Sequence, residues 1–414
     1  MTLTFESDMI KTTKKLIKKR VLKELFMISV CIITKNQSKN IKECLKRLTP
    51  LDYEIIVVDT GSTDNTKDIA LEYTDKVFDY KWCDDFSAAR NFSIGKATQE
   101  YVLIIDSDEF LTEVNKTELE NLIRNNSKYV GRICRTNVQW DGNEQVKITE
   151  RINRLFPKEL YHYTGRIHEQ IVTNEIVEIA GKNSSGEDNK NKYENKNNNE
   201  HNNNSEGKKE YITYNLPILI DHIGYDGDIE FRKIKTHRNI ELLNKDLQEN
   251  GEDPYTLYQL GKSYYMQQDY TEACEYFARA LSFDLNPKLE YMIDMVETYG
   301  YALINLKQFK EALQYENIYE EFGNRPEFKF LMGLIYMNNE MYQNAIDEFL
   351  KATEYEGCQT EGVNTYKAFY NVGVIYECLG DVGKAISYYE KCEGYNKAEE
   401  RMKILTTNCN NKLN

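Results

Sequence analysis

The first hundred residues alternate between short apolar runs and amphipathic segments. The runs at residues 28–33, 54–58 and 101–105 are almost wholly apolar, which is typical of strands buried on both faces. Residues 38–48 lie between two of these runs and have the apolar spacing of a helix. The alternation predicts a mostly parallel sheet with helices on both faces, in which ligands bind beyond the carboxyl ends of the strands.

The second apolar run ends in Asp59, which opens the segment DTGSTD. Gly61 in this segment permits a tight turn and a close approach of the backbone to a ligand. The structural alternative is an N-cap turn, a role that we assign mainly to Asp64. A carboxylate directly after buried residues would lie deep in the cleft. We therefore expect Asp59 to accept a hydrogen bond from a base N–H or a ribose hydroxyl.

Asp106 and Asp108 follow the run at residues 101–105. Two carboxylates at positions i and i+2 past a strand end can point into one cleft, and oxygen ligands suit Mg²⁺ or Mn²⁺. Such an ion would neutralise charge on a departing nucleoside diphosphate. Acidic pairs also cap helices or solvate turns, and the adjacent Glu109 favours that alternative. The position after a buried strand favours the metal site.

Three segments together resemble the family 2 glycosyltransferases. Residues 28–36 (ISVCIITKN) resemble the first strand and donor-site loop of the family, residues 54–66 (EIIVVDTGSTDNT) its second strand, and residues 101–109 (YVLIIDSDE) its metal-binding motif. The family usually has Asn-Glu where this chain has Asn36-Gln37. The resemblance implies a Rossmann-like α/β domain of the GT-A type that binds a nucleotide sugar, with a UDP-sugar as the expected donor.

The resemblance also implies roles for individual residues. Thr34 and Asn36 would line the donor loop, Asp59 would contact the nucleotide, and Asp106 and Asp108 would hold Mg²⁺ or Mn²⁺ beside the diphosphate. Family 2 enzymes are inverting, which implies a single in-line displacement.

Four further segments also resemble the family, at residues 82–91, 151–156, 165–169 and 221–225. The last three recur in a subgroup of family 2 enzymes fused to tetratricopeptide repeats, which includes the sublancin-type peptide S-glycosyltransferases. Those enzymes attach a sugar to a cysteine of a bacteriocin peptide. The resemblance supports the architecture more firmly than a cysteine acceptor.

These segments supply the remaining candidate residues. Arg90 or Arg154 is expected to bind the diphosphate, since Arg makes bidentate phosphate contacts, although an Arg near a helix start is more often a surface ion-pair partner. An acceptor O–H or S–H must lose its proton, so a base is needed; Glu169 is our candidate and His168 the alternative. His222 would complete the metal or diphosphate site, although a lone His is usually structural.

From residue 230 the pattern is purely helical and has an internal period. Four glycines, at intervals of 39, 33 and 40 residues, each have a large residue three positions on and an alanine twelve positions on. Small residues at fixed positions let two antiparallel helices approach closely. The pattern resembles the tetratricopeptide repeat over residues 255–395. The pairs are Gly261 with Ala273, Gly300 with Ala312, Gly333 with Ala345, and Gly373 with Ala385.

These patterns divide the chain into four parts: a basic extension (1–26), a catalytic domain (27–229), an all-α tetratricopeptide-like repeat domain (230–400) and a tail (401–414). Within the catalytic domain, residues 182–208 are almost all Asn, Lys, Glu, Ser and Gly, which predicts a disordered loop. The extension suits either a membrane-surface helix or a surface segment, and we favour the surface segment. Whether residues 1–26 are native stays open, because Met27 directly precedes the first strand.

Composition narrows the partners and the compartment. A formal net charge of −14 repels a phosphate backbone, so no nucleic-acid partner is expected. The nine Cys show no CxxC spacing, which favours a reducing, cytoplasmic setting. No apolar run approaches the roughly 18 residues that span a membrane.

The sequence predicts sugar transfer from a nucleotide sugar to a peptide, protein or glycan, with the repeats binding the acceptor or forming a homodimer. Three alternatives are a non-catalytic repeat scaffold with a degenerate transferase domain, a surface-polysaccharide glycosyltransferase, and a nucleotidyltransferase. The Asp106/Asp108 pair counts against the scaffold. A nucleotidyltransferase would normally have a Gly-rich loop after the first strand, where this chain has residues 34–37 without Gly. The donor sugar and an O- or S-linkage are not determined.

Overall fold

A computed structural model describes residues 28–141, 144–174, 211–223 and 229–413. These residues form two compact units. The first contains the described residues up to 137, those of 150–174 and those of 211–223; the second contains residues 138–149 and the helices from residue 229 onwards. The predicted extension at 1–26 and the predicted loop at 182–208 lie outside the described residues. Within the described part, no helix combines the length and apolar character needed to cross a membrane.

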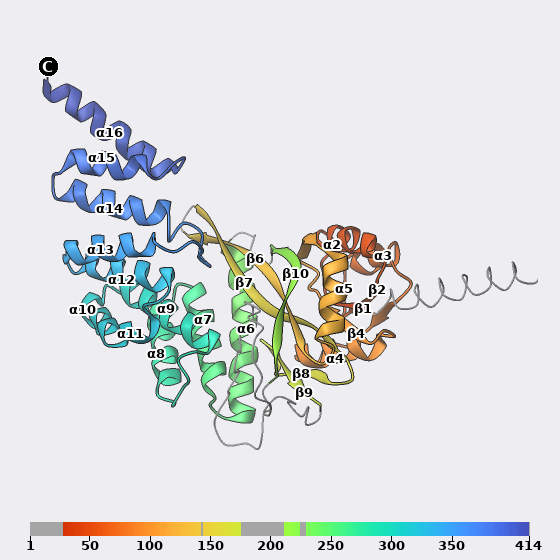
Figure 1. The fold of residues 1–414 in the computed structure, drawn as a ribbon. Helices are drawn as coiled ribbons and strands as arrows, with labels where there is room; N and C mark the ends of the chain where they lie inside the picture. The colour runs from red at the N-terminus through yellow and green to blue at the C-terminus, as the bar shows by residue number, and fades with distance from the viewer. Residues whose placement is uncertain (1–27, 142–143, 175–210, 224–228, 414) are drawn as a thin grey trace, which may run out of the picture. The chain divides into compact units, whose positions relative to one another are not determined.

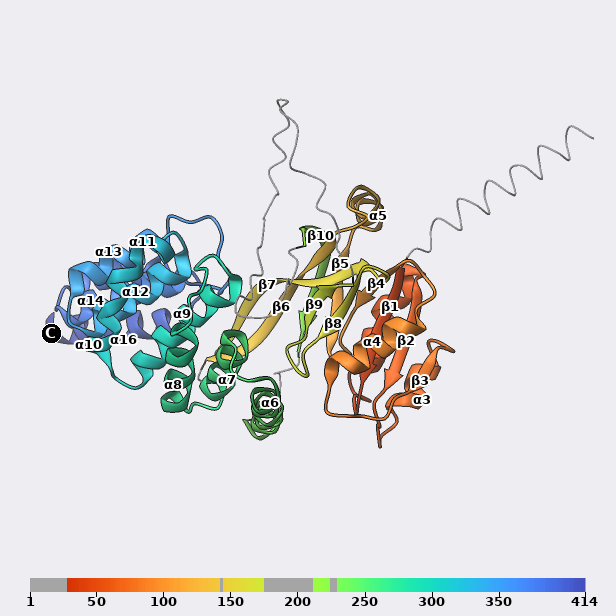
Figure 2. The ribbon, with the colours of Figure 1, turned by 90° about the horizontal axis from the view of Figure 1, so that it is seen from below.

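The first unit is built around an eight-stranded mixed sheet in the order β3-β2-β1-β4-β7-β6-β10-β5 (Figures 1 and 2). A separate antiparallel pair is formed by β8 (Tyr161–Thr164) and β9 (Gln170–Thr173). The strands of the large sheet are β1 (Ile28–Thr34), β2 (Glu54–Asp59), β3 (Val77–Asp79), β4 (Tyr101–Ile104), β5 (Glu109–Val114), β6 (Val130–Asp141), β7 (Glu144–Pro157) and β10 (Thr213–His222).

Four strands make the parallel part of this sheet. β1 lies between β2 and β4 and pairs in parallel with both, and β2 pairs in parallel with β3. All seven residues of β1 are buried, as its unbroken apolar sequence predicts. β4 pairs antiparallel with β7 and β5 pairs antiparallel with β10, whereas β10 pairs in parallel with β6, so the remainder of the sheet is mixed.

Helices cover both faces of the parallel part. Ile28, Val30 and Ile32 of β1 belong to a core that includes the buried face of α2 (Ile41–Leu48). The intervening Cys31 and Ile33 belong to a second core with α4 (Phe86–Lys96). Successive side chains of a strand point to opposite faces, so one apolar run feeds two cores. The other elements here are η1 (Thr49–Leu51), α3 (Thr66–Leu71) and α5 (Lys116–Asn125).

The second unit is a succession of helices that pack mainly as neighbouring pairs, α7 with α8, α12 with α13 and α14 with α15 (Figure 1). The helices are α6 (Ile229–Asn250), α7 (Pro254–Met266), α8 (Tyr270–Leu281), α9 (Glu290–Asn305), α10 (Phe309–Ala312), η2 (Leu313–Ile318), α11 (Tyr319–Phe322), α12 (Pro326–Asn338), α13 (Tyr342–Ala352), α14 (Tyr366–Cys378), α15 (Val382–Glu390) and α16 (Asn396–Leu413).

Three of the four repeated glycines lie where an aromatic ring of the paired helix leaves no room for a side chain. A Cβ atom at Gly261, Gly333 or Gly373 would come within 2.6 Å of the ring sixteen residues later in the sequence. Each alanine of the predicted pattern is fully buried. The second copy is less regular than predicted. Its position sixteen residues after Gly300 is Glu316, and its second helix is broken into α10, η2 and α11.

Candidate functional site

Three strand ends meet at one edge of the sheet in the first unit. Thr34 ends β1 and lies opposite Asp59, which ends β2. Asp106 follows β4, the other neighbour of β1, and the Ile105 N–H just before it donates to the Cys31 carbonyl. The predicted convergence of Thr34, Asp59 and Asp106 at the carboxyl edge is therefore present in the fold. In open α/β sheets, ligands bind beyond the carboxyl ends of the strands, at the point where the strand order reverses.

Asp59 presents one carboxylate oxygen to the backbone and leaves the other without a partner. Its Oδ1 accepts the N–H groups of Gly61 and Ser62 at 2.9 and 2.8 Å, in a turn that Gly61 makes possible with φ of +102°. Its Oδ2 is buried and makes no hydrogen bond with any described residue. A buried acceptor without a donor costs stability, so this oxygen is suited to a ligand N–H or O–H.

The donor-loop residues connect the ends of β1 and β2. Asn36, with φ of +51°, accepts the Thr63 N–H at 2.7 Å through Oδ1, and its own N–H donates to Ser62 Oγ at 2.9 Å. Asn36 thus holds the two loops together. The Thr34 hydroxyl is buried without a hydrogen bond to any described residue, so it too is available to a ligand.

The Asp106 carboxylate lies between two buried arginines. Arg90 of α4 donates to Oδ1 and Arg154 of β7 donates to Oδ2, each at 2.8 Å. Burial alone would raise the pKa of Asp106, but the charges of Arg154 and Arg90 hold it well below its usual range. Arg90 also forms an ion pair with Glu169, while its Nη1 is buried with no described partner. One guanidinium donor is therefore available for an anionic ligand.

Glu109 hydrogen-bonds to the backbone of Asp106 and to two arginines. The sequence did not predict this structural role for the third acidic residue of the segment. It is fully buried, and its Oε2 accepts the Asp106 N–H at 2.9 Å. Its Oε1 accepts from Arg154 at 2.8 Å and from Arg135 of β6 at 3.2 Å. Arg135 in turn pairs with Glu150 of β7 at 2.8 Å. In the sequence, the only signal for Arg135 and Glu150 is that each is a charged residue within a strand.

Asp108 and His222 approach each other from adjacent elements. The His222 Nε2 lies 3.7 Å from Asp108 Oδ2. On the other side of the ring, Nδ1 lies 2.8 Å from Oδ1 of Asn137, the paired residue on β6. The Asn137 amide donates to Glu150, which orients its oxygen toward the histidine. In the neutral ring Nδ1 must then carry the proton, and the Nε2 lone pair faces Asp108.

This geometry fits a divalent cation held in part by the protein. Histidine ligands usually donate their second ring N–H to an oxygen, as His222 does to Asn137. No group of three His, Cys, Asp or Glu side chains suited to a metal ion occurs among the described residues. Asp108 and His222 would thus supply two ligands, and diphosphate and water oxygens the rest, as is usual for Mg²⁺. Both Asp106 oxygens accept from arginine, so its predicted part in metal binding stays a prediction.

The charge of the cluster supports the same conclusion. Five carboxylates and three guanidinium groups of the described residues meet in this cluster. Because acidic side chains outnumber basic ones here, the cluster favours a cation over an anion beside Asp108. The arginines are Arg90, Arg135 and Arg154, and the carboxylates are those of Asp106, Asp108, Glu109, Glu150 and Glu169.

Comparison with known families identifies both units. The model of glycosyl transferase family 2 matches residues 29–184, and tetratricopeptide repeat models match residues 254–287, 326–357 and 366–399. The chain carries a family 2 glycosyltransferase domain. The predicted class, an α/β domain followed by tetratricopeptide repeats, is confirmed, and so is the prediction that the chain is a glycosyltransferase.

Two sequence relatives and one solved structure align with parts of this glycosyltransferase. The SPbeta prophage-derived glycosyltransferase SunS of Bacillus subtilis is 25% identical over 349 residues, which cover 80% of this chain and 73% of the relative. An uncharacterized glycosyltransferase of Rickettsia prowazekii is 28% identical over 37% of this chain and 56% of its own. The crystal structure of S. aureus TarS aligns with 77% of this chain and 54% of its own, at 16% identity and a TM-score of 0.32.

The candidate base of the glycosyltransferase lies on a tight turn after β8. Gly165 and His168 have φ of +94° and +53°, and Glu169 follows with its carboxylate against Arg90. Asn91, the neighbour of Arg90 on α4, holds this region by two hydrogen bonds to the backbone of Tyr163, at 2.8 and 2.9 Å. Glu169 therefore joins the Asp106 cluster through Arg90, and its role as a base stays a prediction.

Proposed function

We propose that the first unit transfers a sugar from a UDP-sugar, with inversion and with the help of Mg²⁺ or Mn²⁺, to a nucleophilic side chain of a peptide or protein. One observation carries the proposal. The carboxyl edge of the sheet, where ligands bind in folds of this kind, holds two buried polar atoms that lack a partner among the described residues. They are a carboxylate oxygen of Asp59 and a guanidinium nitrogen of Arg90. An acceptor and a cationic donor of this kind match a uracil N–H and a phosphate oxygen.

The first step is to bind and orient the donor. Asp59 Oδ2 accepts an N–H of the base, while the Asp59 Oδ1 bonds to Gly61 and Ser62 keep the carboxylate fixed. Arg90 is held by Asp106 and Glu169, so its remaining donor is preorganised for the diphosphate. Arg154, fixed on the other oxygen of Asp106, adds positive charge at the same place.

Asp108 and His222 would hold the divalent cation. The ion would supply charge neutralisation on the departing nucleoside diphosphate. Asn137 fixes the tautomer that turns Nε2 of His222 toward Asp108, and Glu150 fixes the orientation of Asn137. The two ligands are thus positioned by side chains that do not touch the ion.

Deprotonation of the acceptor falls to Glu169, with His168 as the alternative. Glu169 is almost buried, and one of its oxygens is engaged by Arg90. A base so placed would take the proton of the attacking O–H or S–H while Arg90 stabilises the leaving diphosphate. The tetratricopeptide repeats, which generally bind proteins, suit recognition of a polypeptide acceptor or of a second copy of the chain.

A donor-hydrolysis assay on the full chain with UDP-glucose and UDP-N-acetylglucosamine, with and without Mn²⁺, tests the proposal. We expect UDP release that depends on Mn²⁺, falls by two or more orders of magnitude in Asp108→Ala, and is unchanged in Asp52→Ala, an exposed aspartate before β2. Equal UDP release by Asp108→Ala and the parent chain would refute the metal site. Mass spectrometry of peptides incubated with both donors then reports the acceptor.

A further inference from the structure

Two repeats of the second unit carry a stacked tyrosine pair at corresponding places. Tyr264 of α7 stacks on Tyr276 of α8, with ring centroids 5.3 Å apart and planes inclined by 9°. Tyr376 of α14 stacks on Tyr388 of α15 at 5.6 Å and 12°. In both pairs the tyrosines stand three and fifteen residues after the repeat glycine. Each helix pair thus provides two flat rings that cover one another.

At both places a positively charged side chain of the protein lies over a tyrosine ring. The guanidinium of Arg279 lies 4.9 Å from the centroid of Tyr276, and the ammonium of Lys391 lies 4.5 Å from that of Tyr388. In the last repeat, Lys384 also lies 4.8 Å from the Tyr376 centroid. Cations are attracted to the negative face of an aromatic ring. In both repeats that carry the stacked pair, a second ring and a cation therefore lie against the tyrosines.

The repeat built on α12 and α13 keeps only the first tyrosine. Tyr336 lies three residues after Gly333, but the position fifteen residues after this glycine is Glu348. The position that corresponds to Lys384 is Asn344. Among the described residues, Tyr336 neither stacks on another ring nor has a cation over its face. Both components that cover the corresponding tyrosine Tyr376 are absent here.

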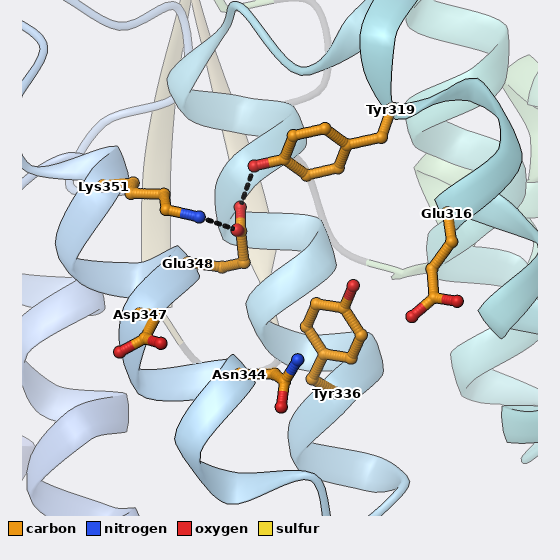
Figure 3. Close-up of a pocket in the computed structure, with 7 residues that line it drawn as sticks. All are labelled: Glu316, Tyr319, Tyr336, Asn344, Asp347, Glu348 and Lys351. Carbon is orange, nitrogen blue, oxygen red and sulfur yellow. Dashed lines mark hydrogen bonds and ion pairs between the residues drawn. The ribbon is translucent and has the colours of Figure 1, made fainter.

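A hollow of about 320 Å³ lies at this place, beside the exposed carboxylates of Glu316 and Asp347 (Figure 3). The buried Glu348 faces the Tyr319 hydroxyl and the Lys351 ammonium, each at 2.6 Å, so its charge is already compensated. Figure 3 shows the Tyr336 ring with Glu316 on one side and Asn344 and Asp347 on the other. The hollow thus combines a flat ring with two carboxylates that no ion pair compensates within the described residues.

We propose that this hollow binds the guanidinium group of an arginine presented by a polypeptide partner. A guanidinium is both planar and cationic, so it replaces at once the ring and the cation that this repeat lacks. A lysine ammonium offers the charge without the plane, and an aromatic ring offers the plane without the charge. Free arginine is disfavoured, because its α-carboxylate would approach Glu316 and Asp347. The proposal is independent of sugar transfer.

A ligand-observed NMR titration of the full chain with N-acetyl-L-arginine amide tests the proposal. We expect saturable binding that weakens as salt is raised, since exposed carboxylates are screened. The N-acetyl amides of lysine and of citrulline, and free L-arginine, should each bind at least about fivefold more weakly, because each lacks the plane, the charge or the neutral backbone. Equal binding of the arginine and citrulline amides would overturn the proposal.

Two variants locate the binding. Glu348→Tyr introduces the ring found at the corresponding position of the two repeats that carry the stacked pair, so it should fill the hollow and abolish binding while the repeat remains folded. Asp347→Asn removes one exposed carboxylate and should weaken binding severalfold, whereas Asp284→Asn, an exposed aspartate of another repeat, should not. Thermal melting of each variant shows whether it is folded. Arginine binding that is unchanged in both folded Glu348→Tyr and Asp347→Asn would place the ligand elsewhere and refute the assignment.

Discussion

At the scale of single residues, the site depends on buried polar side chains that use some of their polar atoms in fixed hydrogen bonds and leave another atom without a partner. Asp59 uses Oδ1 for its own turn and keeps Oδ2 for a ligand; Arg90 uses Nε and Nη2 for carboxylates and keeps Nη1. Such groups are costly in the empty protein and are expected where a ligand will satisfy them. Preorganisation of this kind makes substitutions affect donor binding more than folding.

Asp59→Asn tests the base contact. The amide oxygen can keep the turn to Gly61 and Ser62, but an N–H then replaces Oδ2 and faces the donor of the ligand. We expect the KM for the UDP-sugar to rise roughly 10- to 100-fold, the value of a hydrogen bond to a charged group, with a smaller change in kcat. Steady-state kinetics with Asp79→Asn, the exposed aspartate at the end of β3, as control would show the effect to be specific. An unchanged KM would contradict the assignment.

Asn137→Leu tests the support of His222. Without the amide oxygen the imidazole can turn or change tautomer, so Nε2 no longer faces Asp108. Loss of such a supporting residue typically costs about 10–100-fold in metal affinity. Electron paramagnetic resonance titration of Mn²⁺ in the presence of UDP measures this directly. Asn126→Leu at the end of α5, where the amide donates to the Leu122 carbonyl, should leave the affinity unchanged; an equal loss in both variants would indicate a general structural defect.

At the scale of elements, the repeat helices pair closely because glycine faces an aromatic ring. The same residue type has the opposite role in α4, where a Cβ atom at Gly95 would meet nothing within 4 Å. Helix propensity favours alanine over glycine at both positions. Packing therefore decides the sign of the substitution.

Gly333→Ala should destabilise the second unit. Its Cβ would lie 2.6 Å from the Phe349 ring, and overpacking of this kind costs about 1–3 kcal/mol. Gly95→Ala in α4 should instead stabilise the first unit by about 0.5–1 kcal/mol. Urea unfolding of the two variants measures both changes. The double variant Gly333→Ala/Phe349→Leu should recover part of the loss, and a stabilising Gly333→Ala would show that the helices can separate without cost.

At the scale of the whole molecule, acid should weaken the first unit because its carboxylates are stabilised in their charged form. Burial alone would raise the pKa of Glu54, but hydrogen bonds from Lys76, Ser29 and Thr98 lower it to about 2, and the pKa of Asp106 is also well below its usual range. A depressed pKa in the folded state contributes stability that is present above the unfolded pKa and is lost as pH falls through the folded value.

We therefore expect the Tm of the first unit to decrease between about pH 4.5 and pH 2. Glu54→Gln should be less stable at pH 7 and should lose less on acidification, because its uncharged amide cannot gain from the higher pH. Calorimetry of both proteins over this range measures the difference. A parallel decrease in the two proteins would show that Glu54 does not contribute to the acid sensitivity.

Local patterns were sufficient for the architecture and for the polar edge. Continuous apolar runs predicted β1, β2 and β4, because a strand buried on both faces leaves no position for polar residues. Asp59 at the end of β2 and Asp106 just after β4 then had to meet at one edge, since parallel strands end together. The glycine–alanine spacing predicted the helical repeats, because close helix packing requires small residues at fixed intervals.

Only the tertiary structure decided which charges meet. Glu109 resembles a turn residue in the sequence, yet it is fully buried and holds two arginines from β6 and β7. Likewise, His222 meets Asn137 and Asp108 through strand pairing over more than eighty residues of chain. Hydrophobic periodicity is a local property and is written in the sequence, whereas ion pairing depends on strand order and register, which form only when distant segments are packed together.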